Sequence, residues 1–531
     1  MSETHLDHVR AGRPLVTGQI IVCFGLVLAL FIAARFWNLT ASCLWFDEIF
    51  SLHAARHGWT EMLRFVAADI IHPPLFYILL KLWIGVGGES LLWLRLFPVL
   101  TSIAAIFPFL LLCREFRLRP WEINLALLLM AVNGYLIRYA QEVRMYSLLL
   151  FLSLCSLWLF VRFFRTDSSS RKELLTLCVI NLLLVYTHYA GWLVIALQII
   201  GLLLWKRSRL SAFLITVATI ILGYIPWLYT IAAGRESGKG LIQNIGWVTR
   251  PHARDLVQYF TLLNKPFLST QSSADALYDP LSLCLAALLF GIPLILFSWR
   301  IVRSKLNQDS RRAETVQLLF LFSLGPVVAA FFVSWLLPYS IWGTRHLIIA
   351  AGPYWVLSVL ALSMLRQYWT RVAVFFILAC WFLLAGLILL MSRPPLFIWC
   401  AWGDLAPQLL NVESGSSQPV EVYAFEDLVA YHLWFSLNAV PNSKVTVNVV
   451  KNVPGLTEDP AYFLPRGFTD IAVENHFPSN KDHFWIAFRA TDWDETRPPL
   501  NDLEKVGYRV GKVISKKAQG QEAFLVQLLR K

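Results

Sequence analysis

The most constraining feature of the sequence is a succession of long apolar segments with almost no charged residues, the first of which covers 15–37. A helix needs about 20 apolar residues to cross the hydrocarbon core of a bilayer, and it satisfies its own backbone hydrogen bonds there. The composition agrees, since 57% of the residues are hydrophobic and only 15% are charged, which is too apolar for a soluble protein. The chain is therefore predicted to be a polytopic α-helical membrane protein.

Clusters of Lys and Arg between the apolar segments predict how the chain crosses the membrane. Such clusters favour the cytoplasmic side, and Arg10 and Arg13 place the N-terminus, 1–14, on that side. With about 11 transmembrane helices within 15–391, all five later basic loops fall on the same side. The predicted spans are 15–37, 91–113, 121–137, 144–165, 174–187, 190–205, 210–232, 277–299, 314–337, 346–365 and 372–391.

The apolar stretch 75–87 is not counted as a span. It has 13 residues and contains Lys81, so it is shorter than the roughly 20 residues that a spanning helix needs. Counting it would also move every later basic loop to the opposite side. We expect it to be an interfacial helix within a first outer loop, 38–90; a second, long outer loop is expected over 233–276.

From about residue 415 the composition changes to short β-rich runs that alternate with amphipathic stretches. This pattern predicts a small extracytoplasmic α/β domain over 415–531, joined by a linker at 392–414. The domain carries no recognisable catalytic motif, so a capping or acceptor-docking role is expected. The expected strands are Val420–Phe425, Lys444–Val450, Asp470–Val473, Phe484–Phe488, Tyr508–Ile514 and Phe524–Leu528, and the expected helices are Glu426–Leu437 and Leu500–Val506.

The net charge of +12 does not indicate a nucleic-acid partner, because the Lys and Arg residues lie in short clusters where anionic lipid is expected. Six of the eight cysteines lie inside hydrophobic runs and have no metal-ligand spacing. Cys43 and Cys400 are the two in predicted extracytoplasmic segments. They are the candidates for a disulfide, which the sequence alone does not establish.

Polar residues of unusual type gather on the predicted outer face. Charges near the hydrocarbon boundary are costly unless they pair or face water, so this clustering predicts a polar cavity. Asp47 and Glu48 lie in the first outer loop, and His72-Pro73-Pro74 follows in the same loop. The other candidates lie in three later outer turns and are Arg138, Glu142, Arg144 and Tyr146, then His188 and Tyr189, and finally Arg345 and His346.

Each of these residues also has a structural interpretation. Asp47 and Glu48 suit the N-terminus of an interfacial helix, and two prolines fix a backbone corner after His72. The later residues would then form an ion-pair network (Arg138, Glu142, Arg144), interfacial anchors (His188, Tyr189) and a snorkelling pair (Arg345, His346).

In combination, the motifs resemble the GT-C class of membrane glycosyltransferases, in particular the bacterial branch of the dolichyl-phosphate-mannose–protein mannosyltransferase and aminoarabinose transferase group. The resemblance covers roughly 15–390, is strong over 40–150 and fades over 233–340. The matching motifs are Leu44-Trp45-Phe46-Asp47-Glu48, His72-Pro73-Pro74-Leu75-Phe76-Tyr77, Glu89 with Arg95, the run 138–146, Thr187-His188-Tyr189 and Arg345-His346.

The resemblance implies an enzyme that transfers a sugar, with inversion, from a polyprenyl-phosphate carrier to an acceptor on the outer face of a bacterial inner membrane. Asp47 would be the general base, and Glu48 would orient the base or the acceptor. The family's late arginine is often followed by Tyr, whereas His346 follows Arg345 here. Charge on the departing phosphate would be stabilised by Arg345, His346, Arg138 or Arg144. The other implied substrate-binding residues are His72, Tyr77, Glu142, Tyr146, His188 and Tyr189, and Trp45, Phe46 and Tyr77 would stack on the sugar.

No cofactor is expected beyond the polyprenyl-phosphate sugar, and no metal, because the outer loops lack an Asp-x-Asp pair. Two other classes of function stay open. A transporter or flippase of lipid-linked glycans would carry ionisable residues deep within its spans, and none stands out. A non-catalytic scaffold would use the outer domain to bind a partner. The sugar, the carrier length and the acceptor, whether protein, lipid or polysaccharide, are not specified by the sequence.

Overall fold

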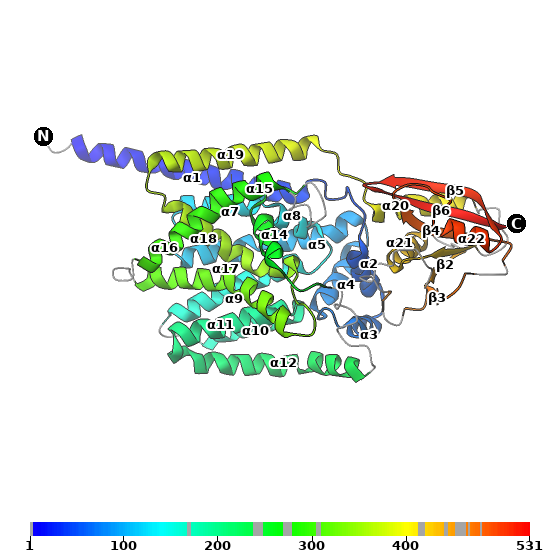
Figure 1. Ribbon diagram of the computed structural model, residues 1–531. Coiled ribbons are helices and arrows are strands. Elements are labelled where there is room, and N and C mark those ends of the chain that lie inside the picture. The colour runs from blue at the N-terminus through cyan, green and yellow to red at the C-terminus, as the bar shows by residue number, and fades with distance from the viewer. Residues whose placement is uncertain are drawn as a thin grey trace.

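The computed structural model shows a bundle of long helices with an α/β domain beyond one of its ends (Figure 1). The residues that the structure describes are 4–166, 171–236, 248–268, 279–303, 310–412, 420–439, 444–451, 464–465, 468–477 and 481–531.

In the described part of the chain, each of the eleven predicted spans is formed by one or more helices. Among the described residues, eight helical stretches are long and apolar enough to cross a membrane, which confirms a multi-pass membrane protein without fixing the number of crossings. The helices of the bundle are α1 (Thr4–Phe36), α5 (Leu91–Ala104), α6 (Ile106–Glu115), α7 (Pro120–Val132), α8 (Gly134–Gln141), α9 (Tyr146–Arg165), α10 (Arg171–Thr187), α11 (Ala190–Trp205), η1 (Arg207–Arg209), α12 (Leu210–Glu236), α15 (Pro280–Ala286), η3 (Ala287–Gly291), α16 (Ile292–Arg303), α17 (Ser310–Leu336), η4 (Thr344–Ala350), α18 (Ala351–Ser363) and α19 (Tyr368–Met391).

The first outer loop folds into three short helices, α2 (Phe46–Arg56), α3 (Trp59–Asp69) and α4 (Leu75–Gly87). Helix α4 is the stretch expected to lie in the interface. Its Lys81 ammonium donates to the carbonyl oxygens of Ala55 at 3.1 Å and His57 at 2.5 Å. Lys81 therefore caps the C-terminal end of α2, and these hydrogen bonds satisfy its charge. At the other end of α4, the rings of Trp83 and Trp93 stack 4.3 Å apart and join α4 to α5.

The second outer loop is more ordered than expected where it is described. Helix α14 (Ala253–Asn264) lies within 233–276, whereas 237–247 and 269–276 lie outside the described residues. Tyr259, Leu262 and Leu263 recur at helical spacing on its buried face. The Tyr259 hydroxyl donates to Leu347 O at 2.8 Å, which fixes α14 against η4.

The C-terminal domain contains every strand and helix that the sequence predicts for it. Its six-stranded sheet has the order β3-β2-β1-β4-β6-β5. The β2–β3, β1–β2 and β1–β4 pairs are parallel, and the β4–β6 and β5–β6 pairs are antiparallel. The elements are β1 (Val420–Ala424), α21 (Asp427–Asn438), β2 (Val445–Val450), β3 (Ala472–Glu474), β4 (His483–Ala490), α22 (Leu500–Lys505), β5 (Tyr508–Ala518) and β6 (Gln521–Arg530).

The expected linker, 392–414, contains helix α20 (Ile398–Val412). Apolar residues at helical spacing, including Ala401, Trp402 and Leu405, are buried, and the helix packs against α21 and β5. Amphipathic periodicity in this stretch therefore favours a helix that is part of the C-terminal domain. A disulfide joins Cys400 of α20 to Cys43, just before α2.

Candidate active site

Helix α2 begins one residue before Asp47, so Asp47 and Glu48 both lie in its first turn. The Glu48 carboxylate accepts a hydrogen bond from the backbone N–H of Trp45 at 3.0 Å, which satisfies a donor that the helix start leaves unpaired. Negative charge in a first turn is also stabilised by the helix dipole. Glu48 thus has the capping role, while Asp47 points to a different set of partners.

Glu48 fastens the first outer loop to the turn after α8. Its side chain is buried, accepts from Val143 N at 2.8 Å and lies 3.6 Å from the Arg95 guanidinium. Burial raises the pKa of Glu48, and the positive charge of Arg95 and the two backbone donors oppose that rise. Because both carboxylate oxygens accept from the backbone, Glu48 is suited to orient the site and not to exchange protons in it.

Arg95 on α5 organises the loop that precedes α2. Its guanidinium donates to Leu39 O at 2.5 Å, Ser42 Oγ at 3.1 Å and Cys43 O at 2.9 Å. The sequence shows Arg95 only as part of a family motif. Its signal was a lone charge near the start of an apolar span, which is costly unless it is paired.

The Asp47 carboxylate faces two arginines that are distant in sequence. Its Oδ2 lies 2.9 Å from Arg345 Nη1 and 3.9 Å from Arg144 Nη2. Arg144 also donates to Asp47 O and Ser51 Oγ, both at 3.1 Å, and Ser51 Oγ donates to Asp47 O at 2.9 Å. The nearby carboxylate raises the pKa of Arg144 against the effect of burial, so this guanidinium is a fixed positive charge beside Asp47.

Arg345 is positioned by the 3₁₀-helix η4, which leads into α18. The Tyr135 hydroxyl donates to Thr344 O at 2.7 Å and so holds the start of η4. The Arg345 guanidinium carbon lies 5.9 Å from the centre of the Tyr146 ring, which is buried. The packing of α8, α9 and η4 therefore brings Arg345 and Tyr146 to Asp47.

Three of the predicted residues, His72, His188 and His346, meet next to these arginines. Each offers a ring nitrogen, and these atoms lie within 4.8 Å of one another. His72 Nδ1 lies 3.3 Å from Arg144 Nη2, and His188 Nδ1 accepts from Ala190 N at 3.0 Å. Burial lowers the pKa of His72 and His188 well below the usual range, and the neighbouring positive charges lower it further. The imidazoles of His72 and His188 are therefore neutral at pH 7. Among the described residues, the three histidines form the one group that could hold a metal ion.

Tyr77 and Tyr189, two of the predicted aromatic residues, have partners in the first outer loop, and Tyr77 also lies near Arg144 of the cluster. Tyr77 is 1% exposed and packs edge-on against Phe50. The Tyr189 hydroxyl donates to Ile70 O at 2.6 Å, where the backbone turns sharply with a φ of 61°. Phe46, expected to stack on a sugar, lies 5.4 Å from the Tyr431 ring of the C-terminal domain. The sequence could not show these contacts, because the partners are distant in the chain.

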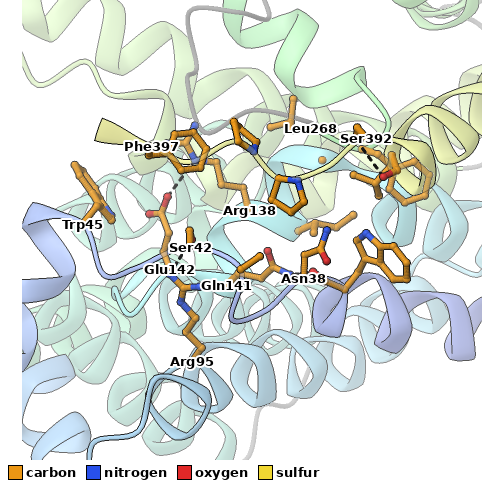
Figure 2. Close-up of a pocket in the computed structure, with 18 of the residues that line it drawn as sticks. Asn38, Ser42, Trp45, Arg95, Arg138, Gln141, Glu142, Leu268, Ser392 and Phe397 are labelled. Atoms are coloured by element: carbon orange, nitrogen blue, oxygen red, sulfur yellow. Dashed lines mark hydrogen bonds and ion pairs between the residues drawn. The ribbon is translucent and has the colours of Figure 1, made fainter. Parts of the chain in front are cut away.

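Arg138 and Glu142 form an ion pair of 3.1 Å at the C-terminal end of α8. Together with Trp45 and Glu48 they line a pocket of about 630 Å³ (Figure 2). The predicted residues are thus divided between two places. Asp47, His72, Arg144, Tyr146, His188, Arg345 and His346 form one cluster, and Glu48, Arg138 and Glu142 line the pocket.

Two buried polar residues that were not predicted from the sequence hold α8 in place. Arg35, in the last turn of α1, donates to Met130 O at 3.1 Å and Ala131 O at 3.2 Å at the end of α7. The Asn133 side chain accepts from Leu136 N at 2.9 Å and so caps α8. Arg35 is an ionisable residue at the end of an apolar span, and this unusual position in the sequence could have identified it.

Comparison with known proteins supports the fold. No family model and no curated protein matches the chain. Among solved structures, ArnT from Cupriavidus metallidurans bound to undecaprenyl phosphate is similar, with a TM-score of 0.57 and 12% identity over 96% of this chain and 98% of that chain. The apo state of the same protein gives the same values. The oligosaccharyltransferase AglB from Archaeoglobus fulgidus reaches a TM-score of 0.49 at 13% identity, covering 79% of this chain and 63% of that one. The predicted GT-C fold, with an α/β domain at the C-terminus, is confirmed.

Proposed function

We propose that this GT-C-fold membrane protein is an inverting glycosyltransferase, which moves a sugar from a polyprenyl-phosphate carrier to an acceptor on the extracytoplasmic face of the membrane. The observation that carries the proposal is the meeting of Asp47, Arg144 and Arg345 at the start of α2. A carboxylate beside two guanidiniums offers a proton acceptor and a phosphate site in one place. In the proposed orientation the N-terminus is cytoplasmic, the C-terminal domain extracytoplasmic, and the membrane the inner membrane of a bacterium.

The reaction would proceed in a single displacement. The donor's phosphate would bind Arg345 and Arg144 and compete with Asp47 for the Arg345 guanidinium, which leaves the Asp47 carboxylate available as a base. The acceptor oxygen would form a bond to the anomeric carbon while the bond from that carbon to the phosphate oxygen breaks. The acceptor's proton would go to Asp47, and the electron pair of the broken bond would stay on the polyprenyl phosphate.

Positive charge at the leaving group carries most of the catalysis in this scheme. A phosphate needs no strong acid to depart, and preorganised donors aimed at the developing charge stabilise it. His72, His188 and His346 would add hydrogen bonds to the phosphate through their ring nitrogens. The scheme uses no metal and no cofactor beyond the donor itself.

The decisive experiment is Asp47→Asn in the full-length protein, assayed for transfer from polyprenyl-phosphate sugars in membranes. We expect transfer to fall by about 100- to 10,000-fold, the usual contribution of a general base, while insertion and thermal stability are retained. Glu61→Gln is the matched control, because Glu61 is an exposed acid of the same outer segment. Undiminished transfer by Asp47→Asn would remove Asp47 as the base. No transfer by the unmodified protein from any such donor would favour a flippase or scaffold.

A further inference from the structure

The pocket beside Glu48 has two walls that come from distant parts of the chain. One wall is the loop from α1 to α2, with Asn38, Ser42 and Trp45, and the other is the segment before α20, with Ser392 and Phe397 (Figure 2). The tip of the β5–β6 hairpin holds the second wall, since Gln519 N donates to Leu396 O at 2.9 Å. At about 630 Å³ the pocket has the size of a small-ligand site.

The ionisable side chains that line the pocket have no net charge. Two cations, Arg95 and Arg138, line it together with two anions, Glu48 and Glu142, and they form the pairs Arg95–Glu48 and Arg138–Glu142. A phosphate would gain no net attraction here. This distinguishes the pocket from the Arg144–Arg345 cluster, where positive charges exceed the single carboxylate of Asp47.

Buried polar atoms in the pocket wall lack partners among the described residues. They include two donors, Trp45 Nε1 and Arg138 Nη1, and an acceptor, Glu142 Oε2. A buried polar atom without a partner is costly, so it marks a place where a ligand would complete the hydrogen bonds. Hydroxyl groups donate and accept at once and therefore match a wall of mixed donors and acceptors.

Aromatic rings and aliphatic side chains complete the lining. Trp37, Trp45 and Trp399 supply flat apolar surfaces beside the polar atoms, the combination that suits a ring with hydroxyls on its edge and C–H groups on its face. Two further lining residues, Ala34 and Leu389, belong to the ends of α1 and α19, helices whose apolar side chains are largely exposed. The pocket thus lies beside the ends of two helices whose apolar side chains are available to lipid.

From these observations we infer that the pocket binds the acceptor, and that the acceptor is a membrane lipid with an uncharged glycosyl head group. That the ligand is the acceptor rests on the proposed function, whereas the chemistry of the ligand follows from the pocket alone. Glu48 forms part of the wall and follows Asp47 in the first turn of α2, so a head group bound here lies next to the helical turn that carries the proposed base. The C-terminal domain supplies one wall and thereby takes part in recognising the acceptor.

The test measures binding without turnover. The full-length protein is placed in phosphatidylcholine nanodiscs that contain 5 to 10% of a glucosyl-, galactosyl- or mannosyl-diacylglycerol, or the same fraction of phosphatidic acid, and hydrogen exchange is followed over 38–45 and 392–399. We expect at least one glycolipid to protect both segments and phosphatidic acid to protect neither. Equal protection by phosphatidic acid, or none by the three glycolipids, overturns the inference. Protection by methyl glycosides in glycolipid-free discs, at concentrations that match the lipid effect, would assign the pocket to a soluble saccharide and overturn the lipid part.

Variants separate the pocket from the reaction. Glu142→Gln is expected to weaken glycolipid binding by about tenfold, because it replaces a hydrogen bond to a charged acceptor by a weaker one to a neutral amide. Glu89→Gln is the control, because Glu89 forms an exposed ion pair with Arg56 outside the pocket. Asp47→Asn is expected to bind the glycolipid as the unmodified protein does while it loses transfer. Binding that survives in a protein without any transferase activity would refute the proposed function and leave the pocket's ligand intact.

Discussion

At the scale of single residues, the site is a balance of buried charges. Asp47 forms ion pairs with Arg345 and Arg144. The Glu48 carboxylate instead accepts hydrogen bonds from the backbone of two different segments. Adjacent carboxylates therefore have different tasks because their surroundings differ. The burial of Glu48 and the arginine partners of Asp47 are properties of the folded chain and not of the Asp-Glu pair.

Arg345→Lys tests the proposed phosphate site. A lysine keeps the charge but loses the planar pair of donors that fits a phosphate, so we expect kcat/KM for the polyprenyl-phosphate donor to fall by about 100- to 1,000-fold. Transfer assays over a range of donor concentrations check this. Arg56→Lys, in the exposed pair with Glu89, should change little. A variant with unimpaired donor use would show that Arg345 serves only to hold Asp47.

The buried histidines predict how stability depends on pH. The pKa of His72 and His188 in the folded protein lies well below the usual value, whereas in the unfolded chain both take up protons near about pH 6.5. The unfolded state then binds more protons, so the stability contribution is present above about pH 6.5 and is lost as the pH falls. We expect the unfolding temperature in detergent to drop between pH 7 and pH 5, and to drop less in His188→Gln. His252 is exposed, so the control variant His252→Gln should show the same drop as the unmodified protein. If the drop in His188→Gln were also as large as in the unmodified protein, this account would be contradicted.

At the scale of secondary structure, the break between α7 and α8 decides where Arg138 and Glu142 point. The chain leaves the helical path at Asn133, and its side chain caps α8 through Leu136 N and donates to Leu263 O of α14 at 2.9 Å. The neighbouring Gly134 packs so close to Leu268 that a side chain would collide with its backbone. Hydrogen bonds of one asparagine therefore connect the pocket wall to the second outer segment.

Asn133→Ala should loosen this break. The change removes the cap and leaves buried backbone groups unpaired, which costs about 1–3 kcal/mol, and it should lower transfer because Arg138 and Glu142 shift. Thermal unfolding and transfer assays check both effects. Ser90→Ala removes a cap from α5 that is exposed, so it should cost at most about 1 kcal/mol and leave transfer unchanged. If Asn133→Ala lost stability but kept full transfer, the break would have no role in positioning the pocket.

At the scale of the whole molecule, the C-terminal domain rests directly on the helix that carries Asp47. The Tyr431 hydroxyl lies 2.9 Å from His53 Nδ1 of α2, and the Tyr431 ring packs against Phe46. The Cys43–Cys400 disulfide joins the two parts at the edge of the pocket and closes a loop of 357 residues. The domain is therefore a structural part of the site.

Cys400→Ser tests that connection. Loss of a native disulfide typically costs about 2–4 kcal/mol, so we expect a lower unfolding temperature. We also expect the KM for the acceptor to rise more than the KM for the donor, because the C-terminal segment forms a wall of the proposed acceptor pocket. Cys380→Ser, which changes an exposed free cysteine on α19, should behave as the unmodified protein. Equal effects on both KM values would place the disulfide's role outside the acceptor pocket.

The sequence by itself determined the membrane class, the helices over the eleven predicted spans and the strands of the C-terminal domain. These follow from local patterns: the length of apolar runs, the placement of Lys and Arg, and the alternation of β-rich and amphipathic stretches. It also singled out most of the polar residues that the structure brings together at the candidate site, because charged and polar groups next to apolar spans are costly and thus conspicuous. The activity itself was drawn from resemblance and remains a proposal.

Only the tertiary structure decided which of those residues meet. Asp47 and Arg345 are 298 positions apart, and their contact depends on how α2 and η4 pack, which no local pattern encodes. The same holds for the three histidines, for the pairing of Cys43 with Cys400 and for the two walls of the pocket. Burial and charge pairing are collective properties of the folded chain, so the division of the polar residues into a charged cluster and a neutral pocket became visible only with the fold.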